Sequence, residues 1–315
     1  MSTGGQANSS GNTPARQIGH QPAAKEAAPA IVGGSVGSRR RPGKWGRVLT
    51  YAVLLGGAVV LLIPFVFMVS SSLKTEAEVA SGSFSLLPEH VQWQNYPQSL
   101  SQMRFRPALA NTVVITVLSV LGQILSSSLV GFGFARFQFR GRNILFIIML
   151  STMMLPAQVT MIPVFVLFRA LGWIDTFWPL IIPAWLASPF FVFMFRQFFA
   201  QVPEELMEAA RIDGAGNWTI YWRLMMPLSG PVIAIVAIYT FMGAWNDFLG
   251  PLIYLNSPQN RTLALALAAF NGQYGVTDAQ QLMAASCVTM LPCILLFFAA
   301  QKYFVESVAM TGLKS

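Results

Sequence analysis

The chain has 315 residues, of which 54% are hydrophobic and only 10% are charged, and its mean hydropathy is +0.56. Soluble domains carry about 25% charged residues, so this composition excludes a water-soluble domain and indicates an integral membrane protein. The formal net charge of +8 is also typical of nucleic-acid binding, but the basic residues flank apolar runs instead of forming one patch, which favours the membrane explanation.

The N-terminal segment is rich in Gly, Ala, Ser, Pro and Gln and ends in a basic run around Arg39, Arg40 and Arg41. Such a composition is typical of disordered chain. A signal peptide is the alternative, but the apolar run that follows is too long for a typical signal sequence and starts late. We therefore expect residues 1–45 to form a disordered cytoplasmic tail and residues 46–315 to form one transmembrane domain.

Six apolar segments are long enough to cross a bilayer, since a helix needs about 20 residues to do so. We expect the spans near residues 48–69, 107–135, 143–168, 176–195, 228–249 and 280–301. The predicted fold is therefore all-α, a polytopic membrane bundle of six transmembrane helices. Four prolines are expected to kink the third and fourth of them: Pro156, Pro163, Pro183 and Pro189.

The distribution of Lys and Arg predicts the orientation of the chain. With the N-terminus inside, 15 of the 20 Lys and Arg residues fall in cytoplasmic segments and five in outer segments. This bias is the positive-inside pattern. Both termini, and the loop between the fourth and fifth spans, are therefore predicted to be cytoplasmic.

That cytoplasmic loop reads EELMEAARIDGAGNWTIYWRLMMPL over residues 204–228. Pro203 suits the first position of a helix, and Glu204 and Glu205 fall in its first turn, where carboxylates meet the positive end of the helix. Gly214 is placed to end the helix in a left-handed conformation. Such a helix is about 16 Å long, too short to span a membrane.

The small residues of this helix favour a protein partner over the membrane surface. A connector resting on lipid is the alternative, but interfacial helices use large apolar and basic residues, whereas this loop has Ala209, Ala210 and Gly214. Small residues permit close approach of another backbone. Glu208 and Asp213 can form charge-assisted hydrogen bonds with Arg or Lys of a partner.

The loop resembles the EAA loop of ABC-importer permeases, whose pattern is EAA, three residues, G, nine residues, I, one residue and LP. Here Glu208-Ala209-Ala210 precedes Gly214 by three residues, and Leu224 and Met226-Pro227 follow at the family's spacing. In that family the loop forms a cytoplasmic coupling helix that docks in a cleft of the ATPase subunit. The resemblance implies ATPase-coupling roles for Glu208, Ala209, Ala210, Asp213, Gly214 and Pro227.

Further stretches look like the carbohydrate-importer branch, specifically its maltose-type, six-span permeases: GFGFARFQFRGRN, LPAQVTMIPVF, AWNDFLGPLIYL, RTLALALAAFNGQYG and KYFVESVAMTGLKS. The likeness covers roughly residues 46–315. It implies import of sugars or oligosaccharides, with glycerol phosphate or another polyol-like solute as the alternative. It also implies a second related permease subunit, two copies of an ABC ATPase and an extracytoplasmic substrate-binding protein as partners in the bacterial inner membrane, without nucleic acid.

The sequence contains no phosphate-binding loop of the form G-x-x-x-x-G-K-[ST]. We therefore expect no enzyme and no cofactor in this chain, with ATP and Mg bound by the partner ATPase. His20 and His90 are the only histidines and no metal-ligand spacing is present. A secondary transporter is the alternative from a different class, but it would show an internal repeat and buried ion- or proton-relay groups, and neither is apparent.

Two groups of residues are candidates for solute and partner contacts. Asn246 and Asp247 lie near the outer end of the fifth span, where a hydroxyl-rich solute can hydrogen-bond to them while Trp245 or Trp185 offers a flat apolar face. A structural clasp between helices is the competing interpretation for Asp247. In the outer loop, the stretch Asn271, Gly272, Gln273 and Tyr274 is the candidate contact with the binding protein.

Overall fold

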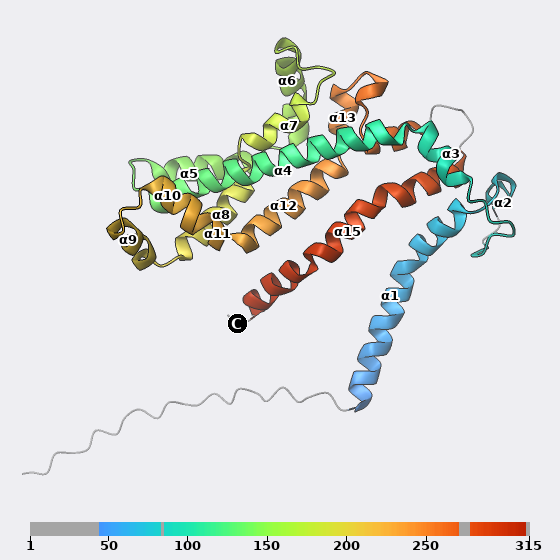
Figure 1. Cartoon of the computed structure of the whole chain (residues 1–315), viewed down its shortest axis with the longest axis horizontal. Helices are drawn as coiled ribbons and strands as arrows, with labels where there is room; N and C mark the ends of the chain where they lie inside the picture. The colour runs from blue at the N-terminus through green and yellow to red at the C-terminus, as the bar shows by residue number, and fades with distance from the viewer. Residues whose placement is uncertain (1–43, 83–84, 271–277, 313–315) are drawn as a thin grey trace, which may run out of the picture. The chain divides into compact units, whose positions relative to one another are not determined.

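The computed structural model describes residues 44–82, 85–270 and 278–312, and every regular element in these ranges is a helix (Figure 1). This result confirms the predicted all-α class. The chain divides within its first helix into two units, Met1–Gly56 and Gly57–Ser315. Of the first unit, the described part is the N-terminal portion of helix α1.

The helices differ widely in length. The longest are α1 (Lys44–Ser72), α4 (Phe105–Arg136) and α15 (Ala279–Gly312). Those of intermediate length are α3 (Asn95–Gln102), α5 (Arg142–Ser151), α6 (Ala157–Ala170), α7 (Trp178–Trp185), α8 (Pro189–Gln201), α9 (Glu204–Ile212), α12 (Gly230–Trp245) and α14 (Leu263–Phe270). The short ones are α2 (Glu76–Ala80), η1 (Thr152–Met154), α10 (Asn217–Ile220), η2 (Tyr221–Met225), α11 (Met226–Leu228), α13 (Leu249–Tyr254) and η3 (Pro258–Asn260).

Four segments of the described chain are long and apolar enough to cross a membrane without a sharp bend: Arg47–Ser72, Phe105–Arg136, Trp178–Gln201 and Ala279–Ala299. The predicted third and fifth spans correspond to bent helix pairs. The count reaches six only if each bent pair is one span. The four unbent segments overlap the predicted first, second, fourth and sixth spans.

The third span is broken, whereas the sequence predicted a kinked but continuous helix over 143–168. The segments Arg142–Met154 and Ala157–Ala170 meet at 99°. Leu155 takes an extended conformation and Pro156 caps α6, because the ring of a proline excludes the helical conformation for the residue before it. Pro163 lies inside α6. The break at Pro156 thus replaces the expected kink.

The fifth span also differs from its predicted range of 228–249. Its helix, α12, has 16 residues and ends at Trp245, so at 1.5 Å per residue it is about 24 Å long, shorter than the roughly 30 Å hydrocarbon core. The preceding segment Asn217–Leu228 meets it at 76°. Asp247 therefore lies beyond the end of α12 and not inside a span.

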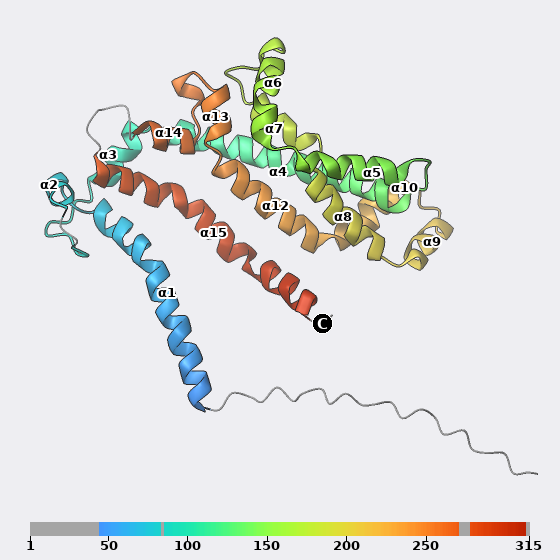
Figure 2. The same ribbon diagram turned by 180° about the vertical axis from the view of Figure 1, so that it is seen from behind.

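Helix α4 forms the centre of the bundle and packs against α7, α8 and α12, which lie beside it in both views (Figures 1 and 2). Its buried face carries small and hydroxyl residues, among them Ser119, Gly122, Ser128 and Gly131. Small residues let helices approach closely in lipid, where there is no hydrophobic driving force between them. Hydrogen bonds add to this packing, and one is donated by the Trp185 indole to the carbonyl of Leu118, at 3.1 Å.

Candidate functional site

Helix α9 forms within the loop that carries the EAA pattern. Pro203 caps the helix and does not occupy its first position as predicted, while Glu204 and Glu205 lie in the first turn. Gly214 has a φ of +82° and ends the helix in the left-handed conformation that the sequence predicts. Its N–H donates to the carbonyl of Arg211 at 3.0 Å, one of the hydrogen bonds that satisfy the C-terminal carbonyls of a helix.

One face of α9 is fixed to the helix bundle through Met207, whose side chain is 1% exposed. Met207 belongs to a buried cluster with residues of α4, α8, η2 and α12, and Ala210 and Ala215 pack against that cluster. The cluster consists of Phe132, Phe195, Phe199, Met207, Ile220, Tyr221, Met225, Val232 and Val236. The sequence pattern does not single out Met207 from Leu206 and Ile212, the other two large apolar residues of α9; only the structure shows which of the three is buried.

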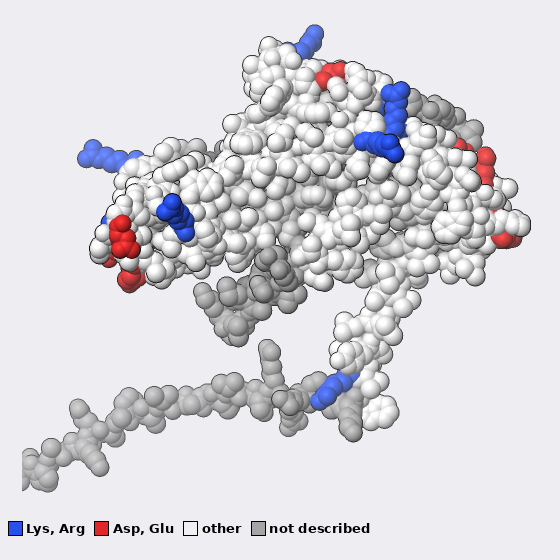
Figure 3. Space-filling view, viewed as in Figure 1, with Lys and Arg blue, Asp and Glu red and all other residues white. Residues whose placement is uncertain are grey.

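The opposite face of α9 is exposed and carries Glu208, Ala209 and Asp213. Small residues dominate the sequence pattern of α9, but the large apolar side chain of Ile212 on the same helix is 87% exposed. Figure 3 shows acidic side chains gathered at the end of the molecule where α9 lies, whereas the long stretch over α4 and α12 is nearly free of charge. This face thus combines an exposed apolar side chain, two carboxylates and small residues, the composition of a protein-binding surface.

The segment between Gly214 and α12 links the loop to the spans. It contains a π-helical turn, Tyr221–Met225, a rare conformation that is frequent at functional sites. The Tyr221 side chain is 1% exposed, and its hydroxyl is hydrogen-bonded to Ser128 Oγ of α4 at 2.7 Å. Pro227 is exposed in α11, immediately before the 76° bend into α12. Tyr221 is therefore a second buried anchor that the sequence analysis missed.

Of the residues proposed for the solute path, only two line the same cavity. Trp245 and Asn246 line a cavity of about 450 Å³ between α12, α14 and α15, together with Ser286 and Thr289. The indole of Trp245 is buried and donates to the carbonyl of Thr289 at 3.2 Å. Asn246 donates to Met242, one turn earlier in the chain, at 2.9 Å.

Asp247 does not line that cavity. Its carboxylate accepts a hydrogen bond from the N–H of Gly250 at 3.0 Å, so it caps the first turn of α13. This hydrogen bond gives Asp247 a local structural role at the start of α13, which differs from the clasp between helices considered as the competing interpretation. Trp185 lies elsewhere, across α4 at Gly122.

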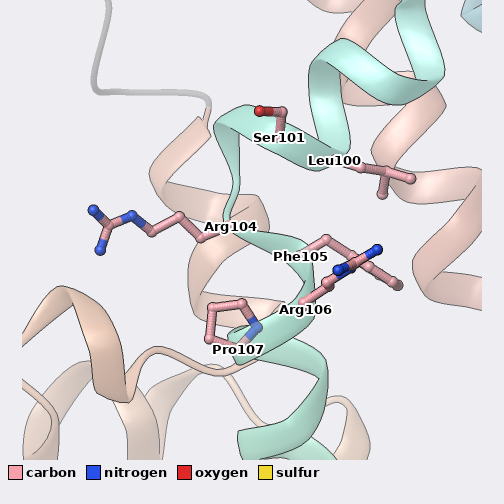
Figure 4. A pocket seen from close by; sticks show the side chains of 6 residues that line it. All are labelled: Leu100, Ser101, Arg104, Phe105, Arg106 and Pro107. Atoms are coloured by element: carbon pink, nitrogen blue, oxygen red, sulfur yellow. The ribbon is translucent and has the colours of Figure 1, made fainter.

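The surface near the start of α4 has a pocket of about 570 Å³ that includes Arg104 and Arg106 (Figure 4). Both guanidinium groups are exposed, and in Figure 4 they point to opposite sides of the helix. The pocket therefore does not direct its two positive charges at one point. The residues expected to contact a binding protein, Asn271, Gly272, Gln273 and Tyr274, lie outside the described residues.

A hydrogen-bonded clasp joins two loops, the one before α7 and the one after α13, which the sequence predicts to lie on the outer side. The Asp175 carboxylate accepts hydrogen bonds from the hydroxyl and N–H of Ser257, from the N–H of Asn256 and from the amide of Asn260. These bonds, with those from Ser257 the most important, lower the pKa of Asp175 from 3.8 to about 2 because they stabilise the charged form. The clasp therefore holds together the loop before α7 and the loop after α13.

Comparison with known proteins places the loop and the bundle in one family. Residues 127–310 match the family described as binding-protein-dependent transport system inner membrane component. The chain is 32% identical to the arabinooligosaccharides transport system permease protein AraQ of Halalkalibacterium halodurans, over 85% of this chain and 97% of that protein. It is 31% identical to the diacetylchitobiose uptake system permease protein NgcG of Streptomyces coelicolor, over 83% of this chain and 87% of that protein.

A solved structure shares the fold. It is a bacterial ABC transporter involved in the import of the acidic polysaccharide alginate, and one of its chains matches with a TM-score of 0.75 and 25% identity, over 84% of this chain and 99% of that chain. The matches confirm the resemblance read from the EAA loop, and the chain belongs to the family of binding-protein-dependent transport system inner membrane components.

Proposed function

We propose that this chain is the permease subunit of an ATP-driven importer for sugars or oligosaccharides, coupled to its ATPase through residues 203–227. Family membership supports the permease role. The relatives AraQ and NgcG are named for arabinooligosaccharides and diacetylchitobiose, and the structurally similar transporter imports a polysaccharide. Carbohydrate is therefore the favoured solute class, with glycerol phosphate or another polyol as the alternative.

The observation that carries the proposal is the two-faced geometry of α9. Its exposed face, with Glu208, Ala209 and Asp213, is free to dock in an ATPase cleft. Its buried face is fixed through Met207 to a cluster that contains residues of α4, α8 and α12. Because packed side chains do not deform continuously, a push on α9 moves the cytoplasmic ends of those helices with it. Closure of the ATPase on ATP thereby becomes rotation of the spans.

The complete importer contains further subunits. We expect a second related permease subunit, two copies of an ABC ATPase that bind ATP and Mg, and an extracytoplasmic substrate-binding protein. A structure of the alginate importer in complex with its periplasmic protein, which shares the fold with a TM-score of 0.57 and 17% identity, agrees with such an assembly. The chain lies in the inner membrane with both termini and α9 on the cytoplasmic side.

Within this chain, the cavity with Trp245 and Asn246 is the better candidate for solute contact. Ser286 and Thr289 add a hydroxyl each to its lining, and a sugar exchanges hydrogen bonds with groups of this kind. Asp247 is a capping residue in this proposal. The outer loop with Asn271, Gly272, Gln273 and Tyr274 remains the proposed contact with the binding protein.

Transport by the reconstituted complex tests the proposed solute class. Proteoliposomes that contain both permeases and the ATPase, with the binding protein added outside, are offered radiolabelled neutral oligosaccharides, uronate oligosaccharides and glycerol 3-phosphate. The proposal predicts ATP-dependent uptake of at least one oligosaccharide. Uptake of glycerol 3-phosphate alone would overturn the carbohydrate assignment and leave the permease role in place.

A further inference from the structure

Arg136, the last residue of α4, makes a set of contacts that the positive-inside pattern does not explain. Its side chain is only 7% exposed, unlike a basic residue that merely marks the cytoplasmic side. One guanidinium nitrogen lies 2.8 Å from the carboxylate of Glu204 in the first turn of α9. The other donates to the backbone carbonyls of Phe199 and Val202.

The carbonyl acceptors of Arg136 exist because of the proline between α8 and α9. In a continuous helix the carbonyl of Phe199 would accept from the N–H four residues later, but that position is Pro203, which has no N–H. The chain leaves the helical conformation at Val202, which has a ψ of 127°, and its N–H reaches Phe199 only at 3.4 Å. Arg136 supplies the stronger donor that this helix end lacks.

Three elements therefore meet at one guanidinium group. The cytoplasmic end of α4 supplies Arg136, the end of α8 supplies two carbonyls, and the start of α9 supplies Glu204. Figure 1 shows these three helix ends near one another. A planar guanidinium with fixed donor directions sets angles as well as distances. Lysine, a point charge on a flexible stem, does not reproduce this geometry.

We propose that Arg136 is a positioning residue that fixes the angle of α9 relative to α4 and α8, so that movement of α9 reaches both spans together. The proposal rests on the proposed function, in which α9 receives the movement of the ATPase. Met207, with Ala210 one turn later, attaches the middle of α9 to the bundle by packing. Arg136 adds a second point at the start of α9, and two points determine the direction of a helix where one does not.

The test measures solute transported per ATP hydrolysed in the reconstituted complex. Arg136→Ala is expected to lower this ratio about tenfold, the effect of losing one charge-assisted hydrogen bond, while ATPase subunits stay bound. Arg136→Lys and Glu204→Gln lower the ratio less, since each keeps part of the network. Arg140→Ala is the matched control, because Arg140 is exposed in the adjoining loop and is expected to leave the ratio unchanged.

A second readout is independent of transport and of the solute. Spin labels at the exposed positions Gln138, just after α4, and Ala209, on α9, report the distance between the two elements in a chain whose native cysteines are replaced by serine. The proposal predicts one narrow distance distribution in the parent chain and a broader one with Glu204→Gln or Arg136→Lys. Unchanged distance distributions and an unchanged transport ratio in both variants would overturn the proposal. If the parent complex itself fails to transport solute but the variants still show the predicted broadening, only the proposed function is contradicted.

Discussion

Gly122 and Gly214 are both required to be glycine, but for different physical reasons. A Cβ on Gly122 would overlap the indole ring of Trp185, so the missing side chain makes room for a neighbouring helix. Gly214 has open space around its Cα but a φ of +82°, so it is needed for its backbone conformation. The same residue type thus serves helix packing at one position and helix termination at the other.

The close contact at Gly122 predicts a loss of stability on adding a single methyl group. Gly122→Ala is expected to destabilise the chain by roughly 1–3 kcal/mol through overpacking against Trp185. Gly133→Ala on the same helix is the control, because no atom lies within 4 Å of its added Cβ and alanine favours helix. The measurement is the thermal unfolding midpoint in detergent. Equal midpoints for the two variants would contradict the packing of Trp185 on α4.

The conformation of Gly214 predicts a graded loss of coupling. Gly214→Ala adds strain of roughly 1–2 kcal/mol at a positive φ and is expected to weaken transport modestly. Gly214→Leu is expected to be much worse, because its bulk would project from an exposed turn into the ATPase cleft. Gly214→Asn is the control, since asparagine tolerates this conformation.

The readouts for Gly214 are uptake, ATP hydrolysis and retention of the ATPase subunits on purification. Insertion and pairing with the second permease are expected to survive in all three variants. The surface-connector interpretation predicts the reverse, because added apolar bulk helps a helix that rests on lipid. Wild-type uptake with full ATPase retention in Gly214→Leu would therefore favour the connector.

At the scale of elements, the clasp around Asp175 gives the outer loops a defined response to pH. The folded pKa of about 2 lies below the ordinary value of 3.8, so the charged form contributes stability above about pH 4. That contribution is lost as the pH falls toward 2. Asp175→Asn keeps the shape and the tolerance of a φ of 63° but removes the charge.

Limited proteolysis in detergent measures this response. We expect faster cleavage of the wild-type loops at pH 3 than at pH 6. In the opened loops Asp175 binds a proton near its ordinary pKa of 3.8, so opening costs less free energy at pH 3, although Asp175 in the closed clasp stays charged until about pH 2. Asp175→Asn is expected to be cleaved faster than wild type at pH 6 and to show a smaller change between the two pH values. Identical pH profiles for the two proteins would contradict the role given to the clasp.

Comparison of the predicted and observed helices shows which features hydropathy and proline patterns determine: the bounds of a span, but not the angle of a bend. Long apolar runs without interruption, such as α4, were predicted near their observed bounds because length and composition alone specify a membrane helix. The 99° break at Pro156 was not predicted, and before α12 the sequence indicated a turn at Pro227 but not the angle of 76°. A proline weakens a helix at a known point, but the angle that follows depends on what the two halves pack against, which a local pattern does not contain.

At the scale of the whole molecule, the orientation is a prediction that labelling tests directly. Single cysteines at Ala209 and at Gln259, both exposed, are placed in a chain whose two native cysteines are replaced by serine. The account predicts that a membrane-impermeant reagent labels position 259 in intact cells and position 209 only after the membrane is opened. Labelling of position 209 from outside would contradict a cytoplasmic α9.

The functional site was predictable from sequence only where its residues are close together in the chain. The EAA spacing located α9, and Gly214 indicated where it ends. Met207, Tyr221 and Arg136 were missed because their roles depend on partners far away in the sequence, such as Ser128 and Glu204. The solute path was predicted as one cluster, but Asp247 does not line the cavity with Trp245 and Asn246; it lies beyond the end of α12 and bonds to the first turn of α13.

The most direct test of the central claim is the energy source of transport by the reconstituted complex. Proteoliposomes that contain this chain, its partner permease and the ATPase are given the binding protein and a radiolabelled oligosaccharide outside, with either ATP inside or an imposed proton or sodium gradient. The account predicts accumulation with ATP only, dependent on the binding protein. Accumulation driven by an ion gradient without ATP would contradict it and identify the chain as a secondary transporter.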